Sequence, residues 1–413
     1  MLEIGKQYLG KIVGAEMPRF KHRWFGILEV EISNNVIDLY LSGTIAQWFI
    51  TGETVEVVVL DKPKRKNNKV VLEFDDYELY KLYEGYKIKV WPVFKKATEL
   101  PRIDPVTGKT IYSYNLLARE ATYESDYEAI AELEQFHYAS KKFVVAIWRC
   151  ERCGNLIRSN TKPICSVCKT DKYVHIFEIR GSTPASRFLL IELLKREPYE
   201  PRIVAYVIVD PPIPSMHRRL PDGRIIKNIR DKIFSREWFH PAFWPELIYK
   251  RKLKELKEKY GKAIAISKLW EEAKWESLKK SNTAAARISR VVVHPDYRSD
   301  GLGQAAVRLA LEWIEERRIP EMRKRKMLVE TIAMMAKYNP FFEKVGFKYL
   351  WDTASGRPVL YYPLSREAEE IIDKFLNTDP IATQHRGKLC AVSYTHLRAH
   401  ETEADLVCRL LLE

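Results

Sequence analysis

The stretch ARISRVVVHPDYRSDGLGQ, residues 286–304, decides the fold of the chain around it. Its first half, from Ala286 to Val293, is rich in β-branched residues and predicts a strand. Its second half places Gly301 and Gly303 where the strand gives way to a helix, whose apolar face carries Val307, Ala310, Leu311 and Ile314. Glycines at a strand-to-helix turn let backbone N–H groups approach a phosphate closely, and the helix N-terminus adds positive potential. The stretch therefore predicts a phosphate-binding loop.

A second motif, NPFFEKVGF at residues 339–347, follows about 40 residues later, after an apolar strand expected from Met327 to Ala333. Together with the pattern Arg298-x-x-Gly301-x-Gly303, it resembles the two signature motifs of the GNAT superfamily of acyl-CoA N-acyltransferases. The resemblance covers about residues 119–364. It implies an α+β fold with a mixed β-sheet flanked by helices, and acetyl-CoA as the cosubstrate.

The resemblance also implies which residues bind acetyl-CoA. The strand that ends at Val293 would offer its backbone to the pantetheine arm, and the loop amides would hold the pyrophosphate. The expected cofactor-binding residues are Val291, Val292, Val293, Arg298, Ser299, Asp300, Gly301, Leu302, Gly303 and Gln304.

Direct N-acyl transfer needs a proton acceptor for the amine and a proton donor for the leaving thiolate. In many GNAT relatives a tyrosine of the second motif protonates the thiolate, but Phe342 stands at the matching position. Tyr338, one helical turn earlier, is the candidate donor, with a partly buried structural tyrosine as the alternative. Glu330, in the apolar strand, is the candidate base because burial raises a carboxylate pKa. The alternatives for Glu330 are an edge position or an ion pair with Arg287 or Arg290.

Four cysteines form the pattern C-x2-C-x11-C-x2-C, at Cys150, Cys153, Cys165 and Cys168. In a chain without a secretory signal this spacing predicts a metal site rather than disulfides. Four thiolates complete a tetrahedral zinc shell and leave no position for water, so the Zn²⁺ is expected to be structural. Iron or reduced thiols are the alternatives. The sequence predicts a zinc ribbon at residues 148–172, inserted in the GNAT region.

Residues 1–96 contain short alternating runs at 26–32, 36–41, 54–60 and 69–74, separated by turn signals. They predict a small all-β, barrel-like domain of the OB type. A basic cluster at one hairpin tip indicates nucleic-acid contact or a solvated loop, and consists of Lys62, Lys64, Arg65, Lys66 and Lys69. Residues 97–118 are expected to be a linker.

Three further segments complete the chain. A capping box at Ser125 to Glu128 predicts a helix of about four turns. Residues 236–280 predict a helical insertion, or a solvated amphipathic hairpin, and residues 365–390 a C-terminal helix or linker. Residues 391–413, AVSYTHLRAHETEADLVCRLLLE, resemble the translated read-through of a sequencing adapter, and we leave them out of the fold prediction as a non-native tail.

The whole arrangement resembles an archaeal family in which an ABC-type ATPase is fused to a predicted acetyltransferase domain. Three stretches carry this resemblance: GSTPASR at residues 181–187, RRIPEM at 317–322 and WDTASGRP at 351–358. It implies an ATPase domain beyond Thr378 in the natural protein. Residues 1–413 themselves contain no Walker A sequence.

The composition indicates which kinds of partner to expect. The 413 residues hold 69 Lys and Arg against 55 Asp and Glu, a net charge of +14. This charge favours polyanions such as RNA, although lysine-rich thermophilic and archaeal-type proteins reach it without binding nucleic acid. An apolar run of about 18 residues and a signal h-region are both missing from the sequence, so we expect a cytoplasmic protein without a membrane partner.

Two functions are consistent with these patterns. The first is an acetyl-CoA-dependent N-acetyltransferase that acts directly on a macromolecular amine, either an RNA base or an amine of a ribosome-associated protein. The second is an RNA or ribonucleoprotein adaptor or sensor with a non-catalytic GNAT fold. The phosphate loop favours the enzyme, whereas Phe342 at the tyrosine position favours the adaptor.

Overall fold

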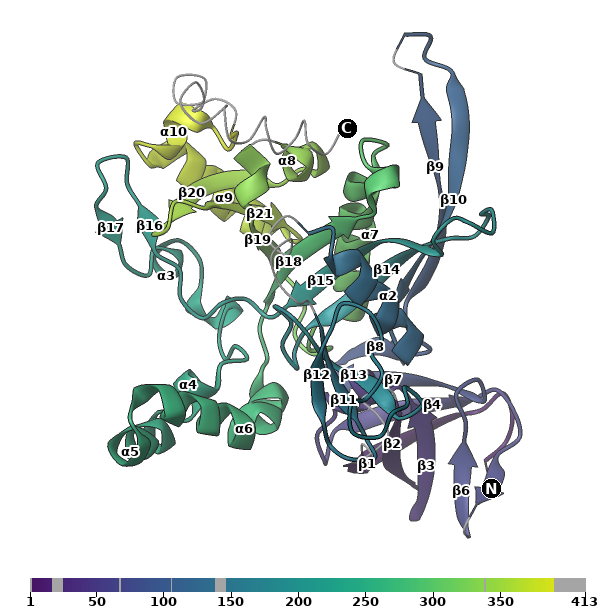
Figure 1. The fold of residues 1–413 in the computed structure, drawn as a ribbon. Coiled ribbons are helices and arrows are strands. Elements are labelled where there is room, and N and C mark those ends of the chain that lie inside the picture. The colour runs from purple at the N-terminus through teal and green to yellow at the C-terminus, as the bar shows by residue number, and fades with distance from the viewer. Residues whose placement is uncertain are drawn as a thin grey trace. The chain divides into compact units, whose positions relative to one another are not determined.

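A computed structural model describes residues 2–16, 25–66, 68–104, 106–137, 146–337 and 339–389. The chain divides into two compact units (Figure 1). The first unit comprises Met1–Pro214 and Phe239–Lys326, and the second comprises Ser215–Trp238 and Met327–Glu413. The region expected to form one GNAT domain, residues 119–364, therefore contributes to both units.

The first unit begins with an eight-stranded sheet in the order β5-β6-β3-β2-β1-β4-β7-β8. Its strands pair antiparallel except for the parallel pair β3–β6. The expected runs are confirmed as β2, β3, β4 and β6, and closure into a barrel stays a prediction. The strands are β1 (Gln7–Glu16), β2 (Gly26–Ile32), β3 (Asn35–Leu41), β4 (Thr54–Val59), β5 (Lys64–Lys66), β6 (Lys69–Leu72), β7 (Tyr77–Tyr83) and β8 (Tyr86–Trp91), with the short helix α1 (Gly43–Ala46) after β3.

A second sheet of the first unit has the order β18-β15-β14-β10-β9, with antiparallel neighbours throughout. The expected linker at residues 97–118 is wrong, because most of it forms β9 and β10. Alternating exposed and half-buried residues extend these strands beyond the sheet as a two-stranded arm (Figure 1). The strands are β9 (Lys95–Ile103), β10 (Thr110–Glu120), β14 (Arg187–Leu193), β15 (Ile203–Asp210) and β18 (Ala285–Val293).

Both faces of this second sheet are covered, because every residue of β15 is buried. Two helices contact β15 and β18: α2 (Glu124–Glu134) and α7 (Leu302–Arg317). The expected capping box of α2 is wrong. The N-cap is Tyr123, two residues before Ser125, and Asp126 Oδ2 accepts from the backbone N–H of Tyr123 at 3.0 Å. The Arg119 guanidinium also holds this carboxylate, at 2.6 and 2.9 Å, so the cap is part of a buried ion pair.

Two insertions interrupt the second sheet. The first is a three-stranded sheet in the order β12-β11-β13, whose buried Trp148 and Ile176 join a core with Tyr127 and Ile130 of α2. Its strands are β11 (Ala146–Cys150), β12 (Leu156–Arg158) and β13 (Val174–Ile179). The second is helical, as expected for residues 236–280, and contains α4 (Pro245–Ile248), α5 (Lys250–Tyr260) and α6 (Lys262–Lys280). The short helix η1 (Arg236–Trp238), at the start of the expected range, belongs to the second unit.

The second unit contains the strand order β17-β16-β20-β21-β19. The expected C-terminal helix is present as α9, which begins where Ser365 Oγ accepts from the N–H of Ala368 at 3.1 Å. Among the described residues, no helix is long and apolar enough to span a bilayer. The remaining elements are β16 (Arg218–Arg219), β17 (Ile225–Ile226), α3 (Arg230–Ile233), β19 (Leu328–Ile332), η3 (Met334–Lys337), α8 (Phe341–Val345), β20 (Lys348–Thr353), β21 (Pro358–Pro363), α9 (Arg366–Thr378) and α10 (Ala382–His385).

Candidate functional site

The predicted phosphate loop connects β18 to α7 through the short helix η2 (Pro295–Tyr297). Gly301 caps α7 with φ +87°, a left-handed conformation that favours glycine, while an added Cβ would approach only Leu100 Cδ1, at 3.9 Å. Backbone conformation rather than space therefore requires glycine here. The first N–H groups of α7, beginning at Leu302, have no acceptor four residues earlier within the helix and are available to an anion.

Arg298 anchors this loop through its guanidinium. Its Nε donates to the carbonyl of Val293 at 3.2 Å, and its Nη2 donates to the carbonyl of Phe136 at 2.9 Å. These bonds join the end of β18 to the residues that follow α2. His294 packs edge-to-face against Phe136 and Tyr297, with ring centroids 5.0 and 5.8 Å away, and burial lowers its pKa. Both side chains thus order the loop.

Asp300, in the middle of the loop, is held by the β9–β10 arm. Its Oδ2 accepts from the hydroxyls of Tyr112 at 2.9 Å and Tyr114 at 2.7 Å. Arg102 Nη1 lies 3.3 Å from Asp300 Oδ1 and donates to the carbonyl of Ser299 at 3.0 Å. These three arm residues were missed from the sequence, although tyrosines at alternate positions of a strand lie on one face and signal a shared contact.

The expected cofactor strand, β18, is irregular at its centre. Arg290 pairs with Ile208 of β15, but the next partner of β15 is Ile288, so Ser289 is an extra residue and forms a bulge. Bulges are frequent next to active sites because they redirect side chains. Beyond the bulge, Val291, Val292 and Val293 pair regularly with β15 and lead directly into the loop.

A buried polar cluster lies beside the bulge and was also missed from the sequence. Glu134, at the end of α2, accepts from Tyr206 of β15 and pairs with Arg290 of β18. Arg290 also donates to the carbonyl of Arg180 at 3.1 Å. Burial, aided by Arg290, lowers the pKa of His137 to about 4. The signal in the sequence was an arginine inside an apolar strand, which demands a buried partner.

Glu330, the candidate base, lies on β19 in the second unit and is completely buried. Its Oε2 accepts from Arg230 Nη1 at 2.8 Å, and the Arg230 side chain is also completely buried. The alternative of an ion pair with Arg287 or Arg290 is wrong, since Arg287 pairs with Asp210 at 3.2 Å and Arg290 with Glu134. The true partner comes from α3, about 100 residues earlier in the chain.

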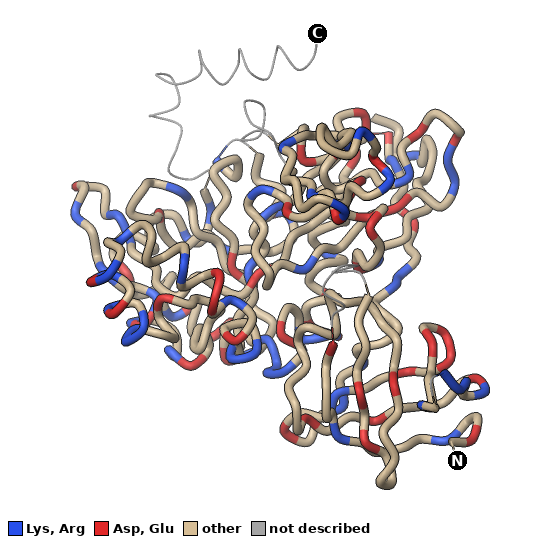
Figure 2. Tube along the Cα trace, turned by 60° about the horizontal axis from the view of Figure 1, so that its bottom comes forward, with Lys and Arg blue, Asp and Glu red and all other residues tan. Residues whose placement is uncertain are grey.

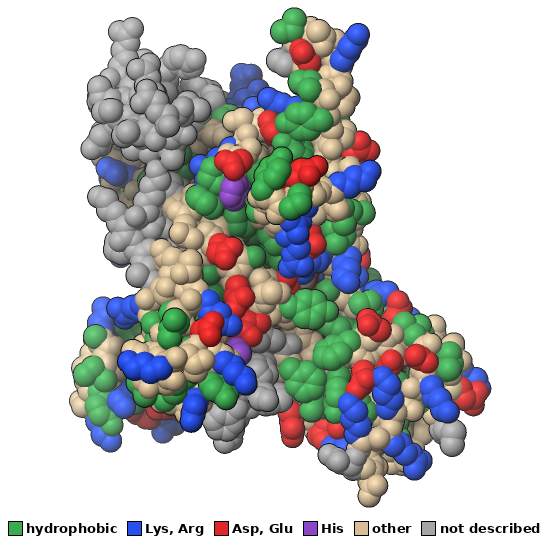
Figure 3. All heavy atoms as spheres, turned by 45° about the vertical axis from the view of Figure 1, so that its right-hand side comes forward, with side chains coloured by type: hydrophobic (Ala, Val, Ile, Leu, Met, Phe, Trp, Pro, Cys, Tyr) green, Lys and Arg blue, Asp and Glu red, His purple; other side chains and the backbone are tan. Residues whose placement is uncertain are grey.

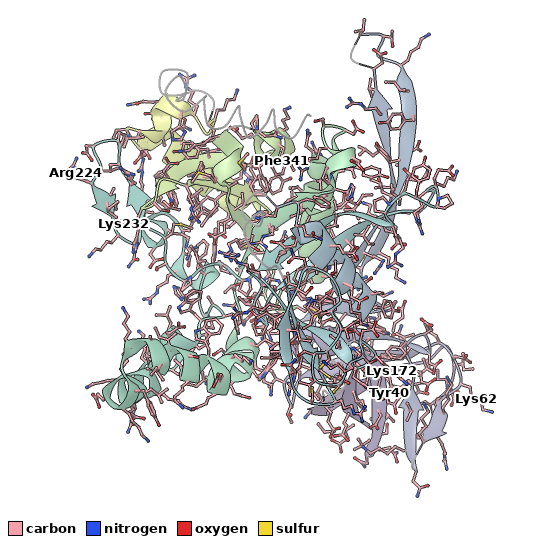
Figure 4. All side chains as sticks on the ribbon, viewed as in Figure 1. Tyr40, Lys62, Lys172, Arg224, Lys232 and Phe341 are labelled. Carbon is pink, nitrogen blue, oxygen red and sulfur yellow. The ribbon has the colours of Figure 1, made fainter. Side chains whose placement is uncertain are left out.

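The candidate proton donor, Tyr338, lies outside the described residues. The second-motif helix is present as α8, and Phe342 is buried in it. Its ring lies 4.3 Å from that of Phe341 and 5.1 Å from that of Phe347, centroid to centroid, and Figure 4 labels Phe341 at the start of the helix. The position that carries tyrosine in many GNAT relatives is thus part of an aromatic core and has no hydroxyl.

The four cysteines converge as predicted. Their Sγ atoms lie within 4.8 Å of one another, with 3.8 Å between Cys150 and Cys168 and 3.5 Å between Cys153 and Cys165. A tetrahedron with Zn–S bonds of about 2.3 Å has S–S edges of about 3.8 Å, so the donor set fits zinc. The Cys168 N–H points at Cys165 Sγ at 3.4 Å and contributes to lowering the pKa of that thiol to about 6.

Comparison with known proteins identifies part of this arrangement. Residues 226–347 match the acetyltransferase (GNAT) family. No curated protein matches the chain. Solved structures that match include the KacTA–DNA complex, with 11% identity, TM-score 0.21, and coverage of 46% of this chain and 74% of that chain. Another is a mosquito arylalkylamine N-acetyltransferase like 5b, with 11% identity, TM-score 0.20, and coverage of 43% and 74%.

The GNAT match spans both motifs, from before β18 to the end of α8. It shows a GNAT acetyltransferase domain in this part of the chain, and this family match indicates acyl transfer from acyl-CoA. The two TM-scores are too low to carry an argument about fold or substrate.

Proposed function

We propose that the chain is an acetyl-CoA-dependent N-acetyltransferase that transfers the acetyl group directly to an amine of a macromolecule, an RNA base or a protein amine. The observation that carries this proposal is the GNAT match over residues 226–347, which contains the left-handed Gly301 turn between β18 and α7. Both the family match and the left-handed turn support the proposal that this loop binds the cosubstrate.

In this proposal β18 and its loop bind the cosubstrate. The backbone of Val291 to Val293 runs along the pantetheine arm, and the N–H groups of residues 299–304 hold the pyrophosphate. Arg298 acts by fixing the loop to the end of β18 and to the residues after α2 rather than by reaching a phosphate, because its guanidinium donates to the carbonyls of Val293 and Phe136. Acetyl-CoA supplies the thioester, and positioning supplies most of the rate.

Two carboxylates are candidates for the proton acceptor, and we favour Glu134 over Glu330. Glu134 is completely buried, like Glu330, but it pairs with Arg290 of β18, the strand proposed to carry the thioester, and Arg290 is 17% exposed, so this ion pair reaches the surface through Arg290. The ion pair of Glu330 with Arg230 is sealed, with 0% exposure on both sides. Tyr338 is retained as the proposed proton donor for the thiolate.

The proposed macromolecular acceptor is supported by the helical hairpin. Helix α5 has no buried residue, and its sequence KRKLKELKEKY carries more Lys and Arg than Glu. Figure 2 shows Lys and Arg, with fewer acidic residues, along this hairpin. Such a surface attracts a phosphate backbone and is expected to bind RNA with a strong salt dependence.

The basic hairpin of the N-terminal sheet supports this less well. Lys64 and Lys66 both pair with Glu73, and Lys69 pairs with Glu29 at 2.6 Å, so local acids neutralise the cluster. Lys66 also lies over the Tyr40 ring, 5.3 Å from its centroid, whereas Lys62 is exposed at the edge of the sheet (Figure 4). We therefore place the first RNA contact on α5.

The second candidate function is a binding protein that has the GNAT fold but no catalytic activity. Phe342 in place of the tyrosine favours an RNA or ribonucleoprotein adaptor or sensor. Incubation with labelled acetyl-CoA and either RNA or ribosomal proteins separates the two. Label on the macromolecule supports the transferase. RNA binding without label transfer, at saturating acetyl-CoA, supports the adaptor.

A further inference from the structure

The β9–β10 arm makes a set of contacts that the proposed transferase does not yet use. Residues 110–114 of β10 pair with β9 and, within the described residues, not with β14, so this part of the arm stands apart from the sheet. Exposed Ile103, Val106 and Ile111 lie along its outer half, and Figure 3 shows hydrophobic side chains on this projection. The arm nevertheless touches the rest of the first unit at one chemically specific place, the loop before α7.

The contacts converge on one carboxylate. Asp300 Oδ2 receives the hydroxyl hydrogens of Tyr112 and Tyr114, and its Oδ1 lies 3.3 Å from Arg102. Burial, followed by hydrogen bonding to Tyr112 and Asp300, raises the pKa of Tyr114 above its ordinary value, so its hydroxyl stays a donor. Tyr114 is also packed against Tyr297, with 5.8 Å between ring centroids. The arm thus contacts the loop at Asp300 and the preceding helix η2 at Tyr297.

A carboxylate within a phosphate loop is electrostatically unfavourable, because it repels the anion that the loop is meant to bind. Here the Arg102 guanidinium of the arm offsets that charge, and the hydroxyls of Tyr112 and Tyr114 stabilise the carboxylate by hydrogen bonds. Arg102 adds a second bond, to the carbonyl of Ser299 at 3.0 Å, and Ser299 itself has φ +67°. Positive φ is uncommon in a non-glycine residue and persists where its surroundings hold it.

We propose that the β9–β10 arm is a positioning element of the acyl-CoA site: Arg102, Tyr112 and Tyr114 draw Asp300 to the arm and thereby hold residues 299–304 in the conformation that presents their N–H groups to the cofactor pyrophosphate. This inference rests on the proposed function of the loop. These arm residues act through Asp300 and are positioning residues.

The test uses two variants whose effect a simple charge argument does not predict. Asp300→Ala removes a negative charge near the phosphates, so charge alone predicts tighter binding of acetyl-CoA, whereas loss of positioning predicts weaker binding. The double variant Tyr112→Phe/Tyr114→Phe leaves the charge unchanged. Ile111→Ala, on the same arm and 59% exposed, is the matched control.

We expect Asp300→Ala and the double variant each to raise the Kd for acetyl-CoA, measured by calorimetry, about tenfold. This factor corresponds to the loss of one or two charge-assisted hydrogen bonds. Amide hydrogen exchange of residues 299–304 is expected to be faster in both variants than in the unchanged protein, each without cofactor. The kcat at saturating acetyl-CoA is expected to stay within about twofold of that of the unchanged protein, while the KM for acetyl-CoA increases. Tighter binding by Asp300→Ala, or unchanged Kd and exchange in the double variant, would overturn the proposal while leaving acetyl-CoA binding intact. Failure of the unchanged protein to bind acetyl-CoA overturns the proposed function as well.

Discussion

Glu330 and Arg230 form an ion pair in the interior of the second unit, with 2.8 Å between Oε2 and Nη1 and no exposed surface on either side chain. Two charges so far from water stabilise each other only as a pair, and removal of one leaves the other buried and uncompensated. The pair therefore joins α3 to β19 and is expected to matter for folding more than for proton transfer.

Glu330→Gln is predicted to destabilise the second unit by about 3 kcal/mol, because Arg230 loses its counter-charge. Denaturant unfolding followed by tryptophan fluorescence measures the change. Glu370→Gln, which breaks an exposed pair with Arg366 on α9, is the control and should change stability by less than about 0.5 kcal/mol. A large loss of kcat in Glu330→Gln without loss of stability would return the role of base to Glu330.

Glu134→Gln is predicted to lower kcat by at least about 100-fold with little change in the KM for acetyl-CoA, as expected for loss of a proton acceptor. Steady-state kinetics with the labelled acceptor measure both constants. Glu132→Gln, exposed on the same helix, should behave like the unchanged protein. Unaltered kcat in a correctly folded Glu134→Gln variant contradicts the assignment of the base.

The burial of Lys81 leads us to expect that the free energy of unfolding depends on pH. Lys81 is fully buried, 2.7 Å from Glu53, and burial together with the charge of Arg323 lowers its pKa to about 7. Between this value and the ordinary value of 10.5, the unfolded chain binds the proton more tightly than the folded one, so this group makes stability rise with pH across that window. Below about pH 7 both states are protonated and the contribution is flat.

The free energy of unfolding is therefore expected to increase, through this group, by about 2 kcal/mol between pH 7 and pH 9. Lys81→Met should lose that increment, since it keeps the packing volume without the charge, and Glu53 retains Arg323 at 3.4 Å. Denaturant melts of both proteins at the two pH values provide the comparison. Parallel pH profiles would show that Lys81 is equally charged in both states.

The four-cysteine centre is predicted to hold one Zn²⁺ per chain, measurable by elemental analysis of protein purified without added metal. Cys153→Ser removes one ligand and should lower the zinc content and expose the Trp148 core of the ribbon to rapid hydrogen exchange. Ser166→Ala, within the same ribbon, is the control. Protein that is still folded and protected at Trp148 after a chelator has removed all metal would contradict a structural zinc.

The sequence predicted correctly those features that depend on residues close together in the chain. The β-branched run ending at Val293 and the glycine turn are present as β18 and the loop before α7, and the cysteine spacing predicted the convergence of four Sγ atoms. These features depend on residues a few positions apart, whose conformations and reach are set by backbone geometry.

Partners contributed by distant segments were not predictable in the same way. Arg230 reaches Glu330, and Tyr114 reaches Asp300, across 100 and 186 positions of sequence. The arm was mistaken for a linker because its Pro, Gly and Asp residues resemble a loop, whereas pairing between its strands supplies the regular hydrogen bonds. A charged residue in an apolar stretch of sequence indicates that the residue has a partner, but it does not indicate which residue that partner is.

The central claim is that the loop before α7 binds acyl-CoA, and calorimetric titration of acetyl-CoA tests it most directly. The unchanged protein is predicted to bind in the micromolar range, and Gly303→Glu, which places a carboxylate in the first turn of α7, to abolish binding. Asn377→Glu, which adds the same charge at an exposed position of α9, should bind normally. Absence of heat for folded, zinc-loaded protein at high ligand concentration, or equal binding by Gly303→Glu, would contradict the account.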